Sequence, residues 1–194
     1  MTEELRQEYD RLFYACETPE QDQPVVKDFI NKLMSGIARY EKVSATTNVP
    51  WFVIGLIHGM EGDFDCNTHL YNGDSLKHRT VNEPAGRPPA SVGDPPFAWE
   101  VSAIDALQYD RFTGWTDWSV PGTCFKLEGY NGWGYRSHQV NSPYLWSMSN
   151  NYSAGKYTSD GHWDPDAVSQ QVGAITALKK MVVDHLVNLS AEPV

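Results

Sequence analysis

The stretch that decides the fold is Pro50-Trp-Phe-Val-Ile-Gly-Leu-Ile-His-Gly-Met-Glu61, which is followed at once by Gly62. Its apolar residues predict a helix that begins near Pro50 and ends at Glu61. A carboxyl group at this end has an apolar floor and the negative pole of the helix dipole beside it. Because burial and the dipole both disfavour the ionised form, we expect the pKa of Glu61 to rise toward the range of a general acid.

Helical periodicity flanks this stretch on both sides. It predicts helices over residues 3–16, from about residue 20 to 43, after Pro95-Pro96, and over 122–128, where Gly129 stops the last of these. The clearest pattern lies near the end of the chain and predicts a helix with Asp164 as N-cap and Pro165 at its first position. The chain is therefore expected to be mainly helical.

Residues 62–97 have a different character. Asn72-Gly73-Asp74 is a turn signal, and the proline-rich segment 83–89 cannot be helical. His69-Leu70-Tyr71 and Arg79-Thr80-Val81 are expected to form two short strands of a small hairpin or irregular sheet. These elements together predict the α+β class. We expect one mainly helical domain over residues 1–194, with a β-containing lobe at about residues 62–97.

The composition argues against several classes of protein. A net charge of −10 leaves no basic stripe to neutralise phosphates, which argues against nucleic acid and against an anionic membrane surface. No apolar run is as long as a membrane span, and the acidic start MTEELRQEYD is unlike a signal peptide. The widely spaced Cys16, Cys66 and Cys124 form neither a disulfide framework nor a zinc motif. We therefore expect a protein made in a reducing cytoplasm, without a signal peptide or membrane insertion.

Aromatic side chains make up 12% of the chain, and many of them lie in polar, glycine-rich stretches between residues 109 and 163. One interpretation is a small domain that packs its core with large rings. The other is a groove lined with rings on which the faces of sugars can stack. The sequence leaves both interpretations open.

Two stretches resemble motifs of a known superfamily. Val49–Phe64 is similar to the helix and Glu-Ser-x-Phe segment of lytic transglycosylases and goose-type lysozymes, with Gly62 in the place of their Ser. Leu127–Gly134 is similar to their Tyr-Asn-x-Gly motif. A helix that ends in Glu, then a small β lobe, then a helical lobe resembles the plan of the lysozyme-like superfamily. The whole chain resembles a phage-type endolysin, which implies a lysozyme-like fold and a catalytic Glu61.

Phage-type lysozymes provide a second comparison. Their catalytic Glu is followed by an Asp and, after five intervening residues, by a Thr; Asp74 and Thr80 have this spacing, although the gap from Glu61 to Asp74 is longer than in that family. Asp74 lies in a polar turn and should stay ionised, and unlike environments of two carboxyls separate acid and base roles. Thr80 is then a candidate to hold the attacking water. A turn-forming Asp74 and an ordinary strand residue at Thr80 are the alternatives.

The resemblance also implies substrate-binding residues around the Tyr-Asn motif. The Asn131 side chain donates and accepts at once, which suits an N-acetyl group, and Tyr130 can stack on a sugar or bond toward Glu61. A turn built around Gly129, Asn131 and Gly132 is the alternative. The candidates for the wall of a groove are Trp133, Tyr135, Tyr144 and Trp146, of which at least two are expected to belong to the core instead, and His69 is expected to line the cleft.

The remaining polar candidates have supporting roles. Glu128 is expected to pair with Arg136 or with a nearby backbone donor. His58-x-x-Glu61 followed by His69 superficially resembles zinc peptidase ligands, but the spacing fits neither HExxH nor HxxEH. We therefore expect no metal and no cofactor.

Together these residues predict a muramidase that hydrolyses the β-1,4 bond between N-acetylmuramic acid and N-acetylglucosamine, with Glu61 protonating the leaving oxygen. A lytic transglycosylase that uses Glu61 alone is the close alternative. A zinc peptidase acting on the peptide stems and a non-catalytic glycan-binding module are further ones. The expected partner is the peptidoglycan glycan strand, bound by a monomer that acts on the cell wall after release.

Overall fold

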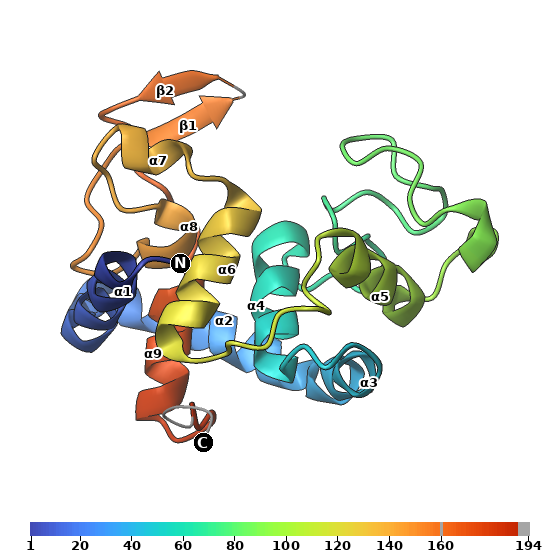
Figure 1. Cartoon of the computed structure of the whole chain (residues 1–194), viewed down its shortest axis with the longest axis horizontal. Helices are drawn as coiled ribbons and strands as arrows, with labels where there is room; N and C mark the ends of the chain where they lie inside the picture. Colours follow the sequence, from blue (N-terminus) through green and yellow to red (C-terminus); the bar gives the residue numbers. More distant parts are fainter. Residues whose placement is uncertain (160, 190–194) are drawn as a thin grey trace. The chain divides into compact units, whose positions relative to one another are not determined.

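The computed structural model describes residues 1–159 and 161–189, which are mainly helical with one small sheet (Figure 1). This confirms the mainly helical α+β class. The chain divides into two compact units, which we call unit 1 (residues 1–30 and 117–194) and unit 2 (residues 31–116). The single domain expected over residues 1–194 stays a prediction. Among the described residues, no helix has the length and apolar character needed to cross a bilayer.

Unit 2 is built around α4 (Trp51–Gly62), in which residues 52–60 are all buried. Helix α3 (Ile37–Thr47) packs against both α4 and α5 (Trp99–Tyr109). Pro50 precedes the first turn of α4, and Asp63 ends the helix with a φ of 44° and an N–H that bonds to the His58 carbonyl. The helix expected over Pro50–Glu61 is therefore confirmed, and it ends one residue later.

The long helix expected from about residue 20 to 43 is wrong. A short 3₁₀ turn, η1 (Glu20–Asp22), leads into α2 (Gln23–Ser35), and the chain then breaks at Gly36 before α3 begins. The Gly36 N–H bonds to the carbonyl of Leu33 at 3.0 Å, three residues back rather than four. The Tyr40 ring fills the space that a side chain at position 36 would need, so the break also serves the packing of α3.

The lobe at residues 62–97 is irregular, and the two strands expected within it do not form. Its described backbone contains one isolated bridge, between Thr68 and Ser75, and the 3₁₀ turn η2 (Ala90–Val92). Side chains bond to the backbone where a strand ladder would otherwise form: the Arg79 guanidinium donates to the carbonyls of Pro88 and Gly93. The lobe is therefore held by polar side chains, and prolines suit it because they have no N–H to leave unpaired.

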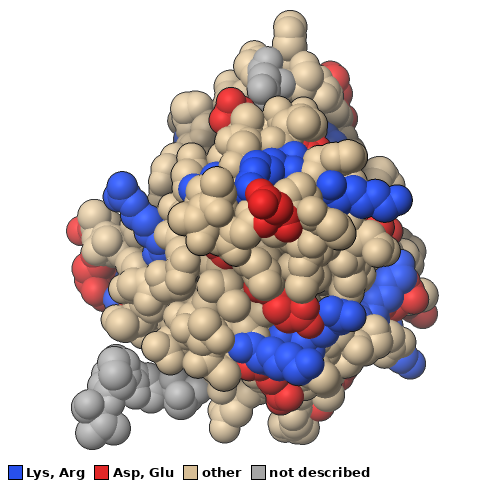
Figure 2. Space-filling model, turned by 90° about the vertical axis from the view of Figure 1, so that its right-hand side faces the viewer, with Lys and Arg blue, Asp and Glu red and all other residues tan. Residues whose placement is uncertain are grey.

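Ion pairs also stabilise unit 2 at several points. Arg87 joins the lobe to α5 through Asp105 at 2.6 Å, and Arg39 joins α3 to α5 through Glu100 at 2.8 Å. On the face of the molecule drawn in Figure 2, basic and acidic side chains are interspersed rather than gathered by sign.

Unit 1 contains the first and last helices. Helix α1 (Glu3–Ala15) packs on α6 (Val120–Asn131), and α8 (Pro143–Trp146) packs on both α6 and α9 (Ala174–Val183). Ser119 caps α6 by accepting from the N–H of Gly122 at 3.3 Å, so this helix is longer than the expected 122–128 and contains Gly129.

The sheet lies in the aromatic stretch that the sequence left without regular structure. Strands β1 (Lys156–Ser159) and β2 (His162–Asp164) pair antiparallel, with Lys156 opposite Asp164, and they lie beside α7 (Gly134–Ser137) (Figure 1). Asp164 belongs to β2 and accepts from the N–H groups of Asp166 and Ala167, so the expected start of the last helix is wrong, while its later part is confirmed by α9. Residues 165–173 bond to other segments instead, and α9 begins only after Gly173.

Candidate functional site

Glu61 lies in the last turn of α4 and is partly exposed. The helix residues from Phe52 to Met60 are buried, so Glu61 lies at the end of a buried helix, as expected. The end of a helix also directs its unpaired carbonyl groups at nearby side chains, which disfavours a negative charge. Glu61 therefore occupies the helix end that the sequence predicts.

The turn that carries Asp74 packs against the end of α4. The His69 N–H bonds to the Asp74 carbonyl at 2.6 Å, and the Gly73 N–H bonds back to the His69 carbonyl at 3.0 Å. Gly73 has a φ of 76°, and a Cβ atom there would lie 2.9 Å from the carbonyl oxygen of Glu61. The backbone segments of Glu61 and Asp74 therefore meet within unit 2.

This close approach leads to a prediction for Gly73→Ala. The left-handed φ alone costs a non-glycine residue about 1–2 kcal/mol, and the contact with the Glu61 carbonyl adds to it. Gly86→Ala is the matched control, because Gly86 has a φ of 78° but no atom within 4 Å of a Cβ atom. In urea unfolding, Gly73→Ala should lose more stability than Gly86→Ala. Equal losses would show that the turn does not press on α4.

Asp74 is held as a carboxylate by its own loop. Its Oδ2 accepts from the N–H groups of Val81 at 2.8 Å and Asn82 at 2.9 Å, and its Oδ1 accepts from Nδ2 of Asn82 at 2.7 Å. Partial burial raises the pKa of Asp74, but these hydrogen bonds outweigh burial and lower the pKa overall. The lowered pKa favours the ionised state expected for Asp74, and the hydrogen bonds show that Asp74 also builds a turn, which was the alternative.

Thr80 does not have the position that its expected role requires. The residue is buried, its hydroxyl donates to the carbonyl of Pro84, and its oxygen accepts from the N–H of Arg87 at 2.8 Å. A hydroxyl whose proton is committed in this way closes the loop over residues 80–87 instead of holding water for attack. The water-holding role is corrected to a structural one.

His69 is a core residue rather than part of a cleft lining. Its side chain is fully buried, Nδ1 lies 2.7 Å from the Ser102 hydroxyl, and Nε2 lies 2.8 Å from the His78 carbonyl. Both ring nitrogens are therefore used inside unit 2, where they join the lobe to α5. The substrate-binding role is corrected to a packing role, and no nitrogen of His69 is left for a metal.

His58, one turn before Glu61, is also buried. Its Nδ1 lies 3.0 Å from the Tyr40 hydroxyl, its ring contacts Trp99 with centroids 4.6 Å apart, and no described residue offers hydrogen-bond geometry to Nε2. Burial lowers the pKa of His58, against smaller opposing effects of Asp65. In the described ranges 1–159 and 161–189, no three His, Cys, Asp or Glu side chains group as metal ligands.

The buried His58 predicts a pH dependence of stability. Because the folded pKa lies below the ordinary 6.5, the unfolded chain binds more protons as the pH falls through that value. The free energy that the neutral His58 contributes to folding is thus fully present above about pH 6.5 and is lost progressively below it. Urea midpoints from about pH 7.5 to about pH 5 should fall less steeply for His58→Gln than for wild type. His162→Gln, at an exposed strand position, should keep the wild-type slope; a wild-type slope in His58→Gln contradicts the assignment.

The Tyr-Asn motif forms the last turn of α6 in unit 1. Asn131 is exposed and its Nδ2 lies 3.4 Å from the Ser142 hydroxyl, while Tyr130 is half-buried beside the Tyr144 ring. Of the three residues expected in the alternative turn, Gly132 does end the helix, with a φ of 105°. Asn131 therefore keeps an accessible amide, as a binding residue must.

Trp133 and Tyr135 differ in exposure. Trp133 is 39% exposed and packs one side on Phe125, with ring centroids 5.0 Å apart. The ring of Tyr135 packs against the rings of Tyr157 and Trp163 in the hairpin. For Tyr135 this favours core packing over a place in a sugar-binding groove. The candidates thus form two sets: Glu61, His69, Asp74 and Thr80 belong to unit 2, and Tyr130, Asn131, Trp133 and Tyr135 belong to unit 1.

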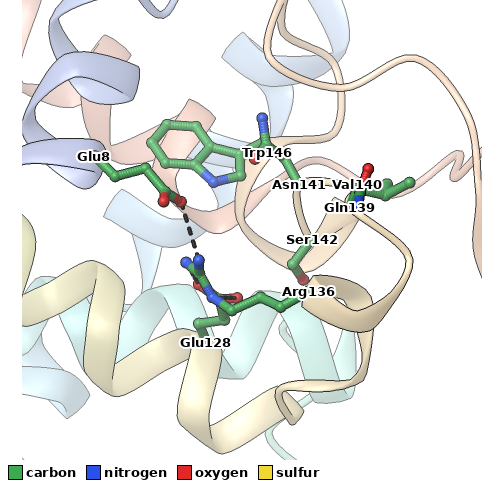
Figure 3. A pocket seen from close by; sticks show the side chains of 8 residues that line it. All are labelled: Glu8, Glu128, Arg136, Gln139, Val140, Asn141, Ser142 and Trp146. Carbon is green, nitrogen blue, oxygen red and sulfur yellow. Dashed lines mark hydrogen bonds and ion pairs between the residues drawn. The ribbon is translucent and has the colours of Figure 1, made fainter. Parts of the chain in front are cut away.

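A cavity in unit 1 is the feature that sequence reasoning missed (Figure 3). It has a volume of about 230 Å³ and is lined by Glu8, Glu128, Arg136, Gln139, Val140, Asn141, Ser142 and Trp146. The expected pairing of Glu128 with Arg136 is confirmed, at 2.7 Å between Oε1 and Nε. The Tyr9 hydroxyl donates to Glu128 at 2.5 Å, and burial raises the pKa of Tyr9, so it stays a donor. The signals in the sequence were the Glu128–Arg136 pair and Trp146, a candidate for the wall of a groove.

Comparisons with known proteins assign no family to the chain. No protein-family model matches it, and neither a curated protein nor a solved structure gives a significant match.

Proposed function

We propose that the chain is a peptidoglycan muramidase of lysozyme-like fold with Glu61 as its general acid. The observation that carries the proposal is the pairing of unlike carboxyl environments within unit 2. Glu61 ends the buried helix α4, and the turn that holds an ionised Asp74 packs on the Glu61 carbonyl oxygen. Such a division lets one carboxyl group donate a proton while the other accepts one.

In this mechanism Glu61 gives its proton to the glycosidic oxygen as the bond from that oxygen to the anomeric carbon breaks. A water molecule adds to the anomeric carbon from the opposite face and gives its proton to Asp74. The outcome is inversion, which requires the two carboxyl groups to lie roughly 6.5–9.5 Å apart. In unit 1, taken by itself, the exposed Asn131 and Trp133 are candidates to bind an N-acetyl group and the face of a sugar.

A lytic transglycosylase is the second candidate, and a specific observation favours it. The Asp74 oxygens already accept three hydrogen bonds from residues 81 and 82, and the Thr80 hydroxyl is committed to its loop. An enzyme that uses Glu61 alone needs neither residue, because the 6-hydroxyl of the muramic acid unit attacks in place of water. The product then carries an anhydro ring instead of a new reducing end.

Asp74→Asn separates these two mechanisms in a turbidity assay on permeabilised Gram-negative cells. If Asp74 activates water, the lytic rate should fall about 100-fold or more. Asp65→Asn is the matched control, because Asp65 is exposed and holds its own turn by accepting from the Asn67 N–H at 2.9 Å. Wild-type lysis by Asp74→Asn contradicts the hydrolytic role. If the wild-type protein sediments with peptidoglycan but releases no sugar, the non-catalytic alternative replaces both.

A further inference from the structure

Arg136 is held rigidly at one wall of the unit 1 cavity (Figure 3). Its Nε and Nη2 atoms make a two-point contact with Glu128, at 2.7 and 2.8 Å, and its Nη1 donates to Glu8 at 3.1 Å. The guanidinium also lies over the ring of Tyr9, 5.4 Å from the centroid. Its positive charge is therefore committed to protein partners before any ligand enters.

Two carboxylates face this single guanidinium, which leaves one negative charge in excess at the cavity. Glu128 is only 3% exposed and already accepts from both Tyr9 and Arg136. Glu8 is 32% exposed, and the ion pair that it makes among the described residues is with Arg136. Because a carboxylate has about four acceptor positions, Glu8 can accept from a cationic donor at the mouth of the cavity.

The other lining groups are polar and uncharged, or aromatic. The indole nitrogen of the buried Trp146 faces the cavity in Figure 3 and can donate to an oxygen of a ligand. Nδ2 of Asn141 donates to the Asn151 carbonyl at 2.9 Å, which fixes that amide and leaves its oxygen as an acceptor. The cavity therefore offers a carboxylate for a cation and both donors and acceptors for hydroxyl groups.

The size of the cavity limits the ligand. A volume of about 230 Å³ equals the space of roughly eight waters, which is enough for one sugar ring. Chemistry and size together point to a small hydroxylated amine.

We propose that this cavity binds an amino sugar with a free ammonium group, with the ammonium on Glu8 and a hydroxyl oxygen accepting from the Trp146 N–H. The site lies wholly within unit 1 and requires no bond cleavage, so it stands independently of the proposed hydrolysis. A free amino sugar and a glucosamine unit in a partly deacetylated glycan carry the same chemistry.

The test is isothermal titration of the full chain with D-glucosamine, N-acetylglucosamine and glucose, which share one ring and differ at a single substituent. We expect glucosamine to bind at least about tenfold more tightly than the two uncharged sugars, because a hydrogen bond to a charged group is lost with them. Amide chemical shifts of residues 139–142 should move with glucosamine. A second titration uses a glucosamine oligomer. If the oligomer binds more tightly than the monomer, the natural ligand is a glycan; if it binds more weakly, the natural ligand is a free sugar.

Glu8→Gln should weaken glucosamine binding about tenfold, since Gln keeps an acceptor for Arg136 but loses the negative charge. Glu3→Gln is the control, because Glu3 is exposed on the same helix and should bind as wild type does. An unchanged unfolding midpoint for Glu8→Gln shows that the fold is intact. Equal affinity for glucosamine and glucose, absence of binding, or wild-type affinity in Glu8→Gln overturns the proposal.

Discussion

Glu61→Gln is expected to abolish lysis of permeabilised cells while leaving the protein folded. Gln has the shape of Glu but has no proton to give to the glycosidic oxygen. General acid catalysis contributes about 10²–10⁴-fold, so the lytic rate should fall by at least about 100-fold. The measurement is the initial rate of turbidity loss, with circular dichroism and the urea midpoint to show that α4 still forms.

The control for this variant is Glu41→Gln, which removes a carboxyl group from an exposed position of α3 in the same unit. Its lytic rate should equal that of wild type. Full lysis by Glu61→Gln would remove both the muramidase and the transglycosylase proposals, because both need the same acid.

Arg136→Met is expected to have the largest effect on stability. It leaves the Glu128 carboxylate, which is 3% exposed, without its ionic partner inside unit 1. Removing one partner of a buried ion pair costs about 3–5 kcal/mol, because the remaining charge stays buried and uncompensated. The urea midpoint should fall by the corresponding amount with an unchanged slope.

Arg6→Met is the matched control for Arg136→Met. Arg6 makes the same kind of ion pair, with Asp117 at 2.9 Å, but both side chains are more exposed, at 40% and 29%. Exposed pairs contribute about 0–1 kcal/mol, so the control should lose little. Similar losses in the two variants would show that burial does not set the strength of the Glu128–Arg136 pair.

Local periodicity was sufficient to predict α1 and α4. In α4 the apolar run, the flanking Pro50 and the polar segment after Glu61 all indicate the same helix. The break at Gly36 was missed because it depends on where the Tyr40 ring packs. The start of the last helix was predicted wrongly at Asp164, because that residue caps a turn and pairs with Lys156 of β1.

The residues of the candidate site also differ in whether neighbours along the chain or contacts made on folding determine their roles. The position of Glu61 and the ionised state of Asp74 followed from neighbours along the chain. The roles of His69 and Thr80 did not, because they depend on Ser102 and Arg87, which reach them through folding of the irregular lobe. The cavity was beyond sequence reasoning for the same reason: Tyr9 and Glu128 are bonded across a separation of 119 residues.

The most direct test of the central claim is digestion of purified peptidoglycan in water enriched in heavy oxygen, followed by mass spectrometry of the released fragments. A muramidase adds one oxygen from water at each bond that it cuts. Wild type should therefore give heavy oxygen at every new reducing end, and Glu61→Gln should give no new ends. Unlabelled anhydromuramic ends, or labelled ends formed equally well by Glu61→Gln, would contradict the claim.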